Sequence, residues 1–123
     1  MSKRNVVHVE IPAADVQAAG KFYQELLGWK ITHDQTLNYA MWEAADGTGG
    51  GLPQVSAESP AGQVLVYIHS DDIEADLRKV EQLGGTVVHP KMEIPNTGWF
   101  GLFKDPTGNV LGLYTSMNPG FGQ

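Results

Sequence analysis

The sequence predicts an α+β fold made of two similar halves, each in the order strand, helix, strand, strand, strand. Short runs of β-branched residues bounded by glycine, proline and aspartate indicate the strands, and two stretches with apolar residues at helical spacing indicate the helices. Asp15-Val16 aligns with Asp72-Ile73 at a spacing of 57 residues. Gly28 aligns with Gly85 at the same spacing, and the two helices are expected to end at Gly28 and at Gly84-Gly85. This constant offset predicts an internal repeat.

The first half begins with a strand predicted over Val6–Pro12, where β-branched residues alternate with others until Pro12 ends the run. A helix is predicted over Ala13–Leu27, because Asp15 suits the N-cap and apolar residues recur every three to four positions. Gly28 suits the left-handed position after the helix. Three further strands complete this half, at Lys30–Thr32, Tyr39–Ala44 and Gly50–Val55.

The second half repeats the plan after a segment with the serine, proline and glycine content of a linker. A strand over Val64–Ile68 leads to a helix whose start is predicted at a capping box of Asp71 and Glu74, with Ser70 as an alternative cap. The remaining strands are predicted at Thr86–Val88, Gly98–Phe103 and Asn109–Thr115. We therefore expect one domain, with module one at about 5–55, a linker at about 56–62, module two at about 63–116 and a tail at 117–123.

Composition excludes several classes of function. The net charge of −6 argues against a nucleic-acid-binding surface. The chain contains no cysteine, which excludes disulfides, thiolate ligands and a cysteine nucleophile. No apolar run is long enough to span a bilayer, and no signal peptide precedes the first strand. We expect a cytoplasmic protein without nucleic-acid or membrane partners.

Three segments carry a family resemblance: His8–Asp15, Lys21–Trp29 with the pattern FY…LG, and Phe103–Leu113 with the turn DP.GN. They resemble the vicinal oxygen chelate (VOC) superfamily of glyoxalases, bleomycin-resistance proteins and extradiol dioxygenases, and the chain looks closest to small glyoxalase-like members. The resemblance implies two βαβββ modules that form a curved eight-stranded cup, and it implies a homodimer. Pattern alone leaves a ferredoxin-like sandwich as an alternative, although two glycine-rich hairpins in each half fit it less well.

The resemblance also implies where a metal would bind. Metal-dependent members hold one divalent ion with a side chain from the first and the last strand of each module. The first-strand positions here are His8 and Leu65, and the last-strand positions are Gly112 and about Pro53, or Leu52 or Gly51 if the register slips. Only His8 can bind a metal, whereas a catalytic metal site needs about three protein ligands. We therefore predict no cofactor.

An improvised metal site is the alternative to this prediction. Glu10 and His69 are the residues that could replace the missing ligands, since each shares a strand face with the site position in its own strand. His69, however, lies four residues beyond position 65 at the mouth of the second helix. A solvated or capping role is expected for it there. We therefore rank a metal-free site above an improvised metal site.

Alternation along the first strand places His8 and Glu10 on one face, and we predict that they form a catalytic pair. The alternative is that His8 is a satisfied polar group at the base of a leftover cavity. Small-molecule pockets combine aromatic walls with a few polar groups. The candidate ligand-binding residues on other strands are Tyr67, Trp99, Tyr114, Trp42 and Leu65, which could instead belong to the core or to a dimer interface.

Three functions follow as alternatives. The first is a metal-free, glyoxalase-like protein or enzyme that binds a small molecule of unassigned identity. The second is a divalent-metal-dependent lyase or isomerase similar to lactoylglutathione lyase, or a protein related to the dioxygenases. The third is a drug-sequestering protein of the bleomycin-resistance type, for which the net negative charge favours a cationic ligand.

Overall fold

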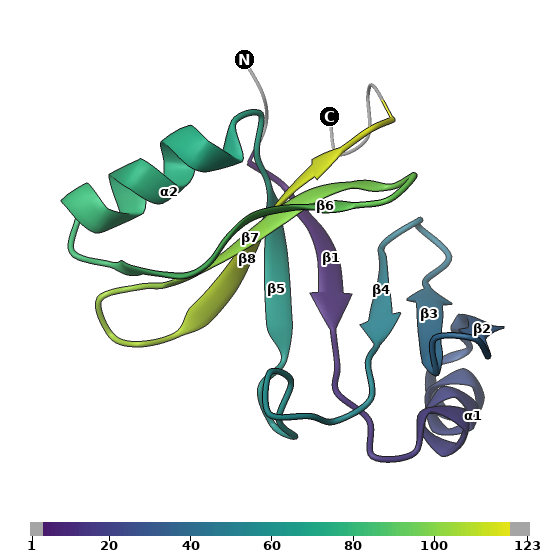
Figure 1. The fold of residues 1–123 in the computed structure, drawn as a ribbon. Helices are drawn as coiled ribbons and strands as arrows, with labels where there is room; N and C mark the ends of the chain where they lie inside the picture. Colours follow the sequence, from purple (N-terminus) through teal and green to yellow (C-terminus); the bar gives the residue numbers. More distant parts are fainter. Residues whose placement is uncertain (1–3, 119–123) are drawn as a thin grey trace. The chain divides into compact units, whose positions relative to one another are not determined.

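The computed structural model describes residues 4–118 (Figure 1). The chain divides into two compact units. Among these residues there are two helices and eight strands, which form two successive βαβββ modules. Module one contains β1 to β4 and α1, and module two contains β5 to β8 and α2. The α+β class and the two βαβββ modules are therefore confirmed, and the ferredoxin-like alternative is wrong.

Module one consists of a four-stranded sheet with α1 on one face (Figure 1). The strand order is β2-β3-β4-β1, in which β4 runs parallel to β1 and the other neighbours are antiparallel. The predicted strand positions hold, with small shifts at their ends. The elements are β1 (Val6–Glu10), α1 (Val16–Leu27), β2 (Lys30–Asp34), β3 (Tyr39–Glu43) and β4 (Gly49–Leu52).

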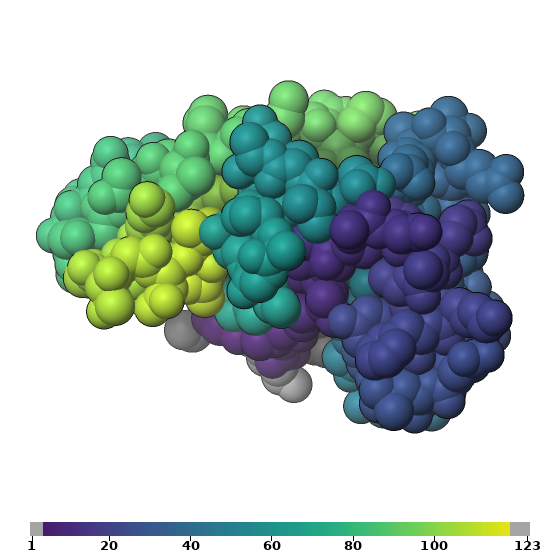
Figure 2. All heavy atoms as spheres, turned by 90° about the horizontal axis from the view of Figure 1, so that it is seen from below, coloured from purple at the N-terminus to yellow at the C-terminus, as the bar shows by residue number. Residues whose placement is uncertain are grey.

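The ends of α1 follow the sequence signals. The Asp15 carboxylate accepts a hydrogen bond from the Ala18 N–H at 3.0 Å and so caps the first turn. Gly28 ends the helix with φ of 72°, a conformation that glycine adopts without steric cost. In the space-filling view, the dark blue atoms of α1 lie together at the surface of module one (Figure 2).

The core of module one lies between α1 and the sheet. Ala40 and Leu52 are fully buried there. Trp42 stacks on Trp29 with ring centroids 3.9 Å apart, and its Nε1–H donates to the Val9 carbonyl oxygen at 3.1 Å. Because this face of the sheet is filled by its own side chains, a ligand site in module one must lie on the other face.

Module two repeats the plan with the strand order β5-β8-β7-β6 and with α2 against β6, β7 and β8. Its core centres on Ile73, Leu77 and Leu113. In the turn before β8, the Asp105 carboxylate accepts the N–H groups of three residues that follow it, each at 2.9 Å. The elements are β5 (Leu65–His69), α2 (Ile73–Gln82), β6 (Thr86–Ile94), β7 (Gly98–Lys104) and β8 (Val110–Ser116).

Two details of module two differ from the sequence prediction. The N-cap of α2 is Asp72, which accepts from the Ala75 N–H at 3.0 Å, and not Asp71 or Ser70. The helix ends as expected at the glycine pair, where Gly84 takes the left-handed conformation with φ of 96°. Strand β6 continues to Ile94 instead of ending at position 88, because an outer strand tolerates proline and register shifts better than a central strand does.

Residues 4–7 group with module two, although the repeat pattern placed the start of module one at about residue 5. The backbone N–H of His69 donates to the Asn5 carbonyl oxygen at 2.9 Å, and Arg4 pairs with Asp76. No helix within residues 4–118 has the length and apolar character needed to cross a membrane. Most of the predicted tail, residues 119–123, lies outside the described residues.

Candidate functional site

The face of module one that lies away from α1 carries a small polar cluster. His8 and Glu10 extend from β1, with His8 Nε2 and Glu10 Oε2 3.4 Å apart. The hydroxyl of Tyr39, at the start of β3, donates to Glu10 Oε2 at 3.0 Å and lies 3.3 Å from His8 Nε2. Val9, which alternates with them, packs in the core on the other face. Strand alternation therefore separates the core from the candidate site, as the sequence predicts.

Gly51 allows Tyr39 to reach this cluster. Strand β4 lies between β3 and β1, and its Gly51 is the register partner of both Glu10 and Met41. A Cβ atom at position 51 would overlap the Tyr39 hydroxyl and ring. Because glycine has no side chain, the tyrosine crosses β4 and contacts β1.

The cluster can bind and move a proton. With a hydrogen on Nε2, His8 donates to the Tyr39 oxygen while Tyr39 donates to Glu10, which links the three groups in one chain. The side chains of His8 and Glu10 are 27% and 19% exposed, so water or a small molecule can still contact them. A carboxylate acceptor beside an imidazole is the arrangement that general acid–base catalysis uses.

The corresponding place in module two is apolar. Tyr67 on β5 is the register partner of Gly112 on β8, and a Cβ atom at position 112 would overlap the Tyr67 ring. Tyr67 is buried. Leu65, the first residue of β5, is also buried. Leu65, at the first-strand site position of this module, has no metal-binding group.

Tyr114 on β8 is half-buried, and its hydroxyl donates to the Thr97 carbonyl oxygen at 3.2 Å. Burial raises the pKa of Tyr114 above its ordinary value of 10.0, and a hydrogen bond with Ser116 only partly offsets this effect. The phenol is therefore neutral at physiological pH and acts as a hydrogen-bonding group rather than as an anion.

The structure places Trp42 and Trp99 on the helix-facing sides of their sheets, which corrects the sequence reasoning about these two residues. Trp42 belongs to the core of module one, with 6% of its surface exposed. Trp99 packs against the core of module two, and the Lys91 ammonium lies 5.5 Å from its ring centroid. Both lie next in sequence to residues on the opposite face, and sequence alone did not fix which parity faces the helix.

The position in module one that corresponds to Gly112 is Gly51, one of the register alternatives, rather than Pro53. Glu10 and Tyr67 are 57 residues apart, like the two N-caps, and they pair with Gly51 and Gly112 respectively. Pro53 lies beyond the end of β4. Within residues 4–118, no group of three histidine, aspartate or glutamate side chains is close enough to hold a metal ion. Of the family-type ligand positions, 51 and 112 are glycines and 65 is a leucine, and these side chains supply no donor to an ion.

His69 is buried rather than solvated, contrary to expectation, with 4% of its surface exposed. Its Nε2 lies 3.0 Å from Asp71 Oδ1, and its carbonyl oxygen accepts from Arg4 at 3.3 Å. Arg4 also pairs with both carboxylate oxygens of Asp76, at 2.6 and 3.0 Å, and the buried Ser70 hydroxyl donates to Asp76 at 2.6 Å. These contacts give His69 a structural role in attaching the N-terminal segment to module two.

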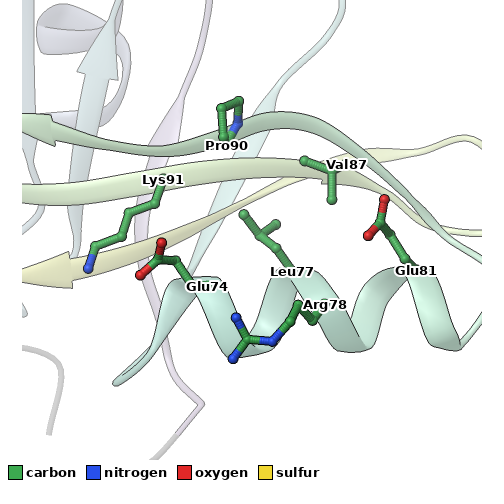
Figure 3. Close-up of a pocket in the computed structure, with 7 residues that line it drawn as sticks. All are labelled: Glu74, Leu77, Arg78, Glu81, Val87, Pro90 and Lys91. Carbon is green, nitrogen blue, oxygen red and sulfur yellow. The ribbon is translucent and has the colours of Figure 1, made fainter.

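A surface groove of about 370 Å³ lies between α2 and β6. Figure 3 shows Leu77 pointing from α2 toward the strands, with charged side chains at the rim. The lining residues are Glu74, Leu77, Arg78, Glu81, Val87, Pro90 and Lys91. None of the site residues predicted from sequence lines this groove, and its mixed charges select no ligand class.

The sequence and the fold match a known family. The model of the Glyoxalase/Bleomycin resistance protein/Dioxygenase superfamily matches residues 5–113. The chain is 29% identical over 113 residues to CFP32 of Mycobacterium bovis, which is named as a candidate glyoxylase. The match covers 86% of this chain and 43% of CFP32, so the chain spans less than half of that relative.

Two other matches cover nearly the whole length of both proteins. A glyoxylase-like domain-containing protein of Didymella fabae is 29% identical over 115 residues, which cover 87% of this chain and 90% of the relative. The crystal structure of methylmalonyl-CoA epimerase from Mycobacterium tuberculosis superposes with a TM-score of 0.73 and 17% identity, over 96% of this chain and 92% of the epimerase. At this identity the likeness shows the fold alone.

Proposed function

Since the chain belongs to the Glyoxalase/Bleomycin resistance protein/Dioxygenase superfamily, we propose that it binds a small organic molecule at the His8–Glu10 face of module one without a divalent metal. The observation that carries this proposal is the pair of glycines at the last-strand positions, Gly51 and Gly112. At each position, the space that a ligating side chain would occupy is taken by a tyrosine side chain. A polar pair therefore remains without the donors that would make it a metal site.

In this proposal Glu10 accepts a proton or a hydrogen bond from the ligand, and His8 orients the ligand or returns the proton. Both side chains are partly exposed, which leaves them accessible to a ligand. The ligand is of unassigned identity. The same site serves a binding protein if the ligand has no acidic proton, and it serves an enzyme if it has one.

The net charge of −6 favours a second candidate, a protein that sequesters a cationic drug in the manner of bleomycin-resistance proteins. The two candidates differ in what His8 does. In a sequestering protein, His8→Ala leaves ligand affinity mostly intact, whereas in a catalytic site turnover collapses while the protein remains folded.

The test begins with protein purified without a chelating tag and analysed for metal by mass spectrometry. We expect far less than one divalent ion per chain. The protein is then titrated with bleomycin and with a panel of small carbonyl compounds while the NMR signals of His8 and Glu10 are followed. Stoichiometric metal would contradict the proposal and favour the metal-dependent lyase or isomerase. Ligand binding that leaves the signals of His8 and Glu10 unchanged would contradict the proposed location of the site.

We also propose that the chain forms a homodimer, as the family resemblance implies. Light scattering coupled to gel filtration measures the mass directly. A mass of 13.3 kDa, that of one chain, would contradict this part of the proposal.

A further inference from the structure

We infer, on the basis of the metal-free site proposed above, that Tyr39 is a third residue of that site and that Tyr39 and Gly51 together replace the metal-ligating side chain of module one. Tyr39 is a positioning residue: it holds His8 and Glu10 in one hydrogen-bonded chain. Gly51 is the specificity-determining position, because the absence of its side chain admits the phenol.

The first support is steric. Met41 and Glu10 flank Gly51 in the sheet, so a side chain at position 51 would extend from the same face as Glu10. That space is taken by the end of the Tyr39 side chain, which a Cβ atom at position 51 would overlap. A ligand at position 51 and the present position of Tyr39 exclude each other.

The second support is chemical. Tyr39 contacts one potential ligand atom of each member of the β1 pair, His8 Nε2 at 3.3 Å and Glu10 Oε2 at 3.0 Å. A cation bound to these two atoms would break the hydrogen bonds of the phenol. An organic ligand with its own hydrogen-bond donors and acceptors can instead extend the chain without breaking it. The site therefore selects a hydrogen-bonding organic molecule over a divalent ion.

The first experiment follows the ring signals of His8 by NMR in protein labelled at histidine. We expect Tyr39→Phe to shift these signals, because it removes the hydroxyl and keeps the ring. Gly51→Ala should shift them similarly by displacing Tyr39, and the double variant should add nothing further. Tyr23→Phe is the matched control, since Tyr23 stacks on Trp29 on the other face of the sheet.

The second experiment restores the missing ligand. The pair Tyr39→Ala and Gly51→Glu removes the phenol and adds a carboxylate beside Glu10. We expect this variant to bind Zn²⁺, measured by calorimetry, at least about tenfold more tightly than the wild type. The control pair, Tyr39→Ala with Gly51→Ala, makes the same space without the ligand and should show no gain.

The outcomes separate the two proposals. In one outcome, the wild type proves metal-free while Tyr39→Phe leaves the His8 signals unchanged. That result would overturn the role of Tyr39 and would leave the metal-free function standing. Stoichiometric metal on the wild type would overturn the function itself. An equal gain of Zn²⁺ affinity in both paired variants would contradict the role of position 51. If the glutamate variant does not fold, the His8 signals of Tyr39→Phe decide.

Discussion

The two modules share one backbone plan but treat the same position in opposite ways. In module one, Tyr39 crosses Gly51 from β3 and joins His8 and Glu10 through its hydroxyl. In module two, Tyr67 stands on the first strand itself, at the position that corresponds to Glu10, and its ring lies against Gly112. In module one the tyrosine beside the glycine belongs to a polar cluster, whereas in module two its ring is buried against the glycine.

The two copies of the repeat therefore share the backbone fold but place different side-chain groups beside the equivalent glycine. The backbone register is the same, since Glu10 pairs with Gly51 as Tyr67 pairs with Gly112. What differs is the strand from which the tyrosine comes. Function in this chain is therefore to be sought first in module one, and the predictions below test that asymmetry, beginning with the largest effect.

Core substitutions should affect both modules equally, because the cores, unlike the sites, are alike. Leu52 in module one and Ile73 in module two are both fully buried. Leu52→Ala and Ile73→Ala should each lower the free energy of unfolding by about 2–5 kcal/mol, as expected when a large apolar side chain leaves a cavity. Urea denaturation measures the loss. A loss below about 1 kcal/mol at either site would contradict the assigned core.

The two glycines should respond differently to alanine. In Gly112→Ala the new methyl group overlaps the buried Tyr67 ring, so we expect a loss of stability of about 1–3 kcal/mol. In Gly51→Ala the overlap involves the outer end of the Tyr39 side chain, which can rotate away at the cost of its hydrogen bonds. Stability should fall less there, while the His8 signals change. Equal losses in thermal unfolding would remove the distinction between the modules.

Module two should show an acid-sensitive stability term that arises from Asp76. Burial raises the pKa of Asp76, but hydrogen bonds from Arg4 and Ser70 together lower it below its ordinary value of 3.8. The carboxylate therefore contributes stability that is fully present above about pH 4 and is lost as the pH falls through the lowered pKa.

Asp76→Asn should remove this term. Because asparagine keeps an oxygen that can accept from Ser70, the loss at neutral pH should be about 1 kcal/mol. The difference in unfolding free energy between wild type and variant should shrink as the pH drops below 4. A difference that stays constant down to pH 2 would show that the Asp76 carboxylate contributes nothing. Arg4→Ala is the control and should show the same trend with a smaller amplitude.

The smallest expected effect concerns the tryptophans of the two modules. Trp99 is in contact with a cation, Lys91, whereas Trp42 stacks on another tryptophan. Lys91→Met should cost about 0.5 kcal/mol, the value for a partly exposed cation–π contact. Tryptophan fluorescence during urea unfolding measures it. An increase in stability would show that the contact is not favourable.

Much of the site could be found from the sequence. Alternation along one strand was enough to place His8 and Glu10 on the same face. Three segments, among them the FY…LG pattern and the DP.GN turn, were enough to recognise the family and its fold. Tyr39 was missed because nothing in its local sequence marks it: it meets β1 only through the pairing of three strands. The tryptophans were misplaced for a related reason, since a shift of one residue in strand parity moves a side chain from one face to the other.

The sequence by itself determined the number, type and order of the elements, because helix caps, turn residues and apolar periodicity act over a few neighbouring residues. Together with the family resemblance, it indicated that only His8 among the four family-type ligand positions has a side chain that can bind a metal. Only the tertiary structure decided that position 51 corresponds to position 112, and that a tyrosine fills the space beside each glycine. Register and side-chain contacts between strands depend on residues far apart in the chain, which no local pattern records.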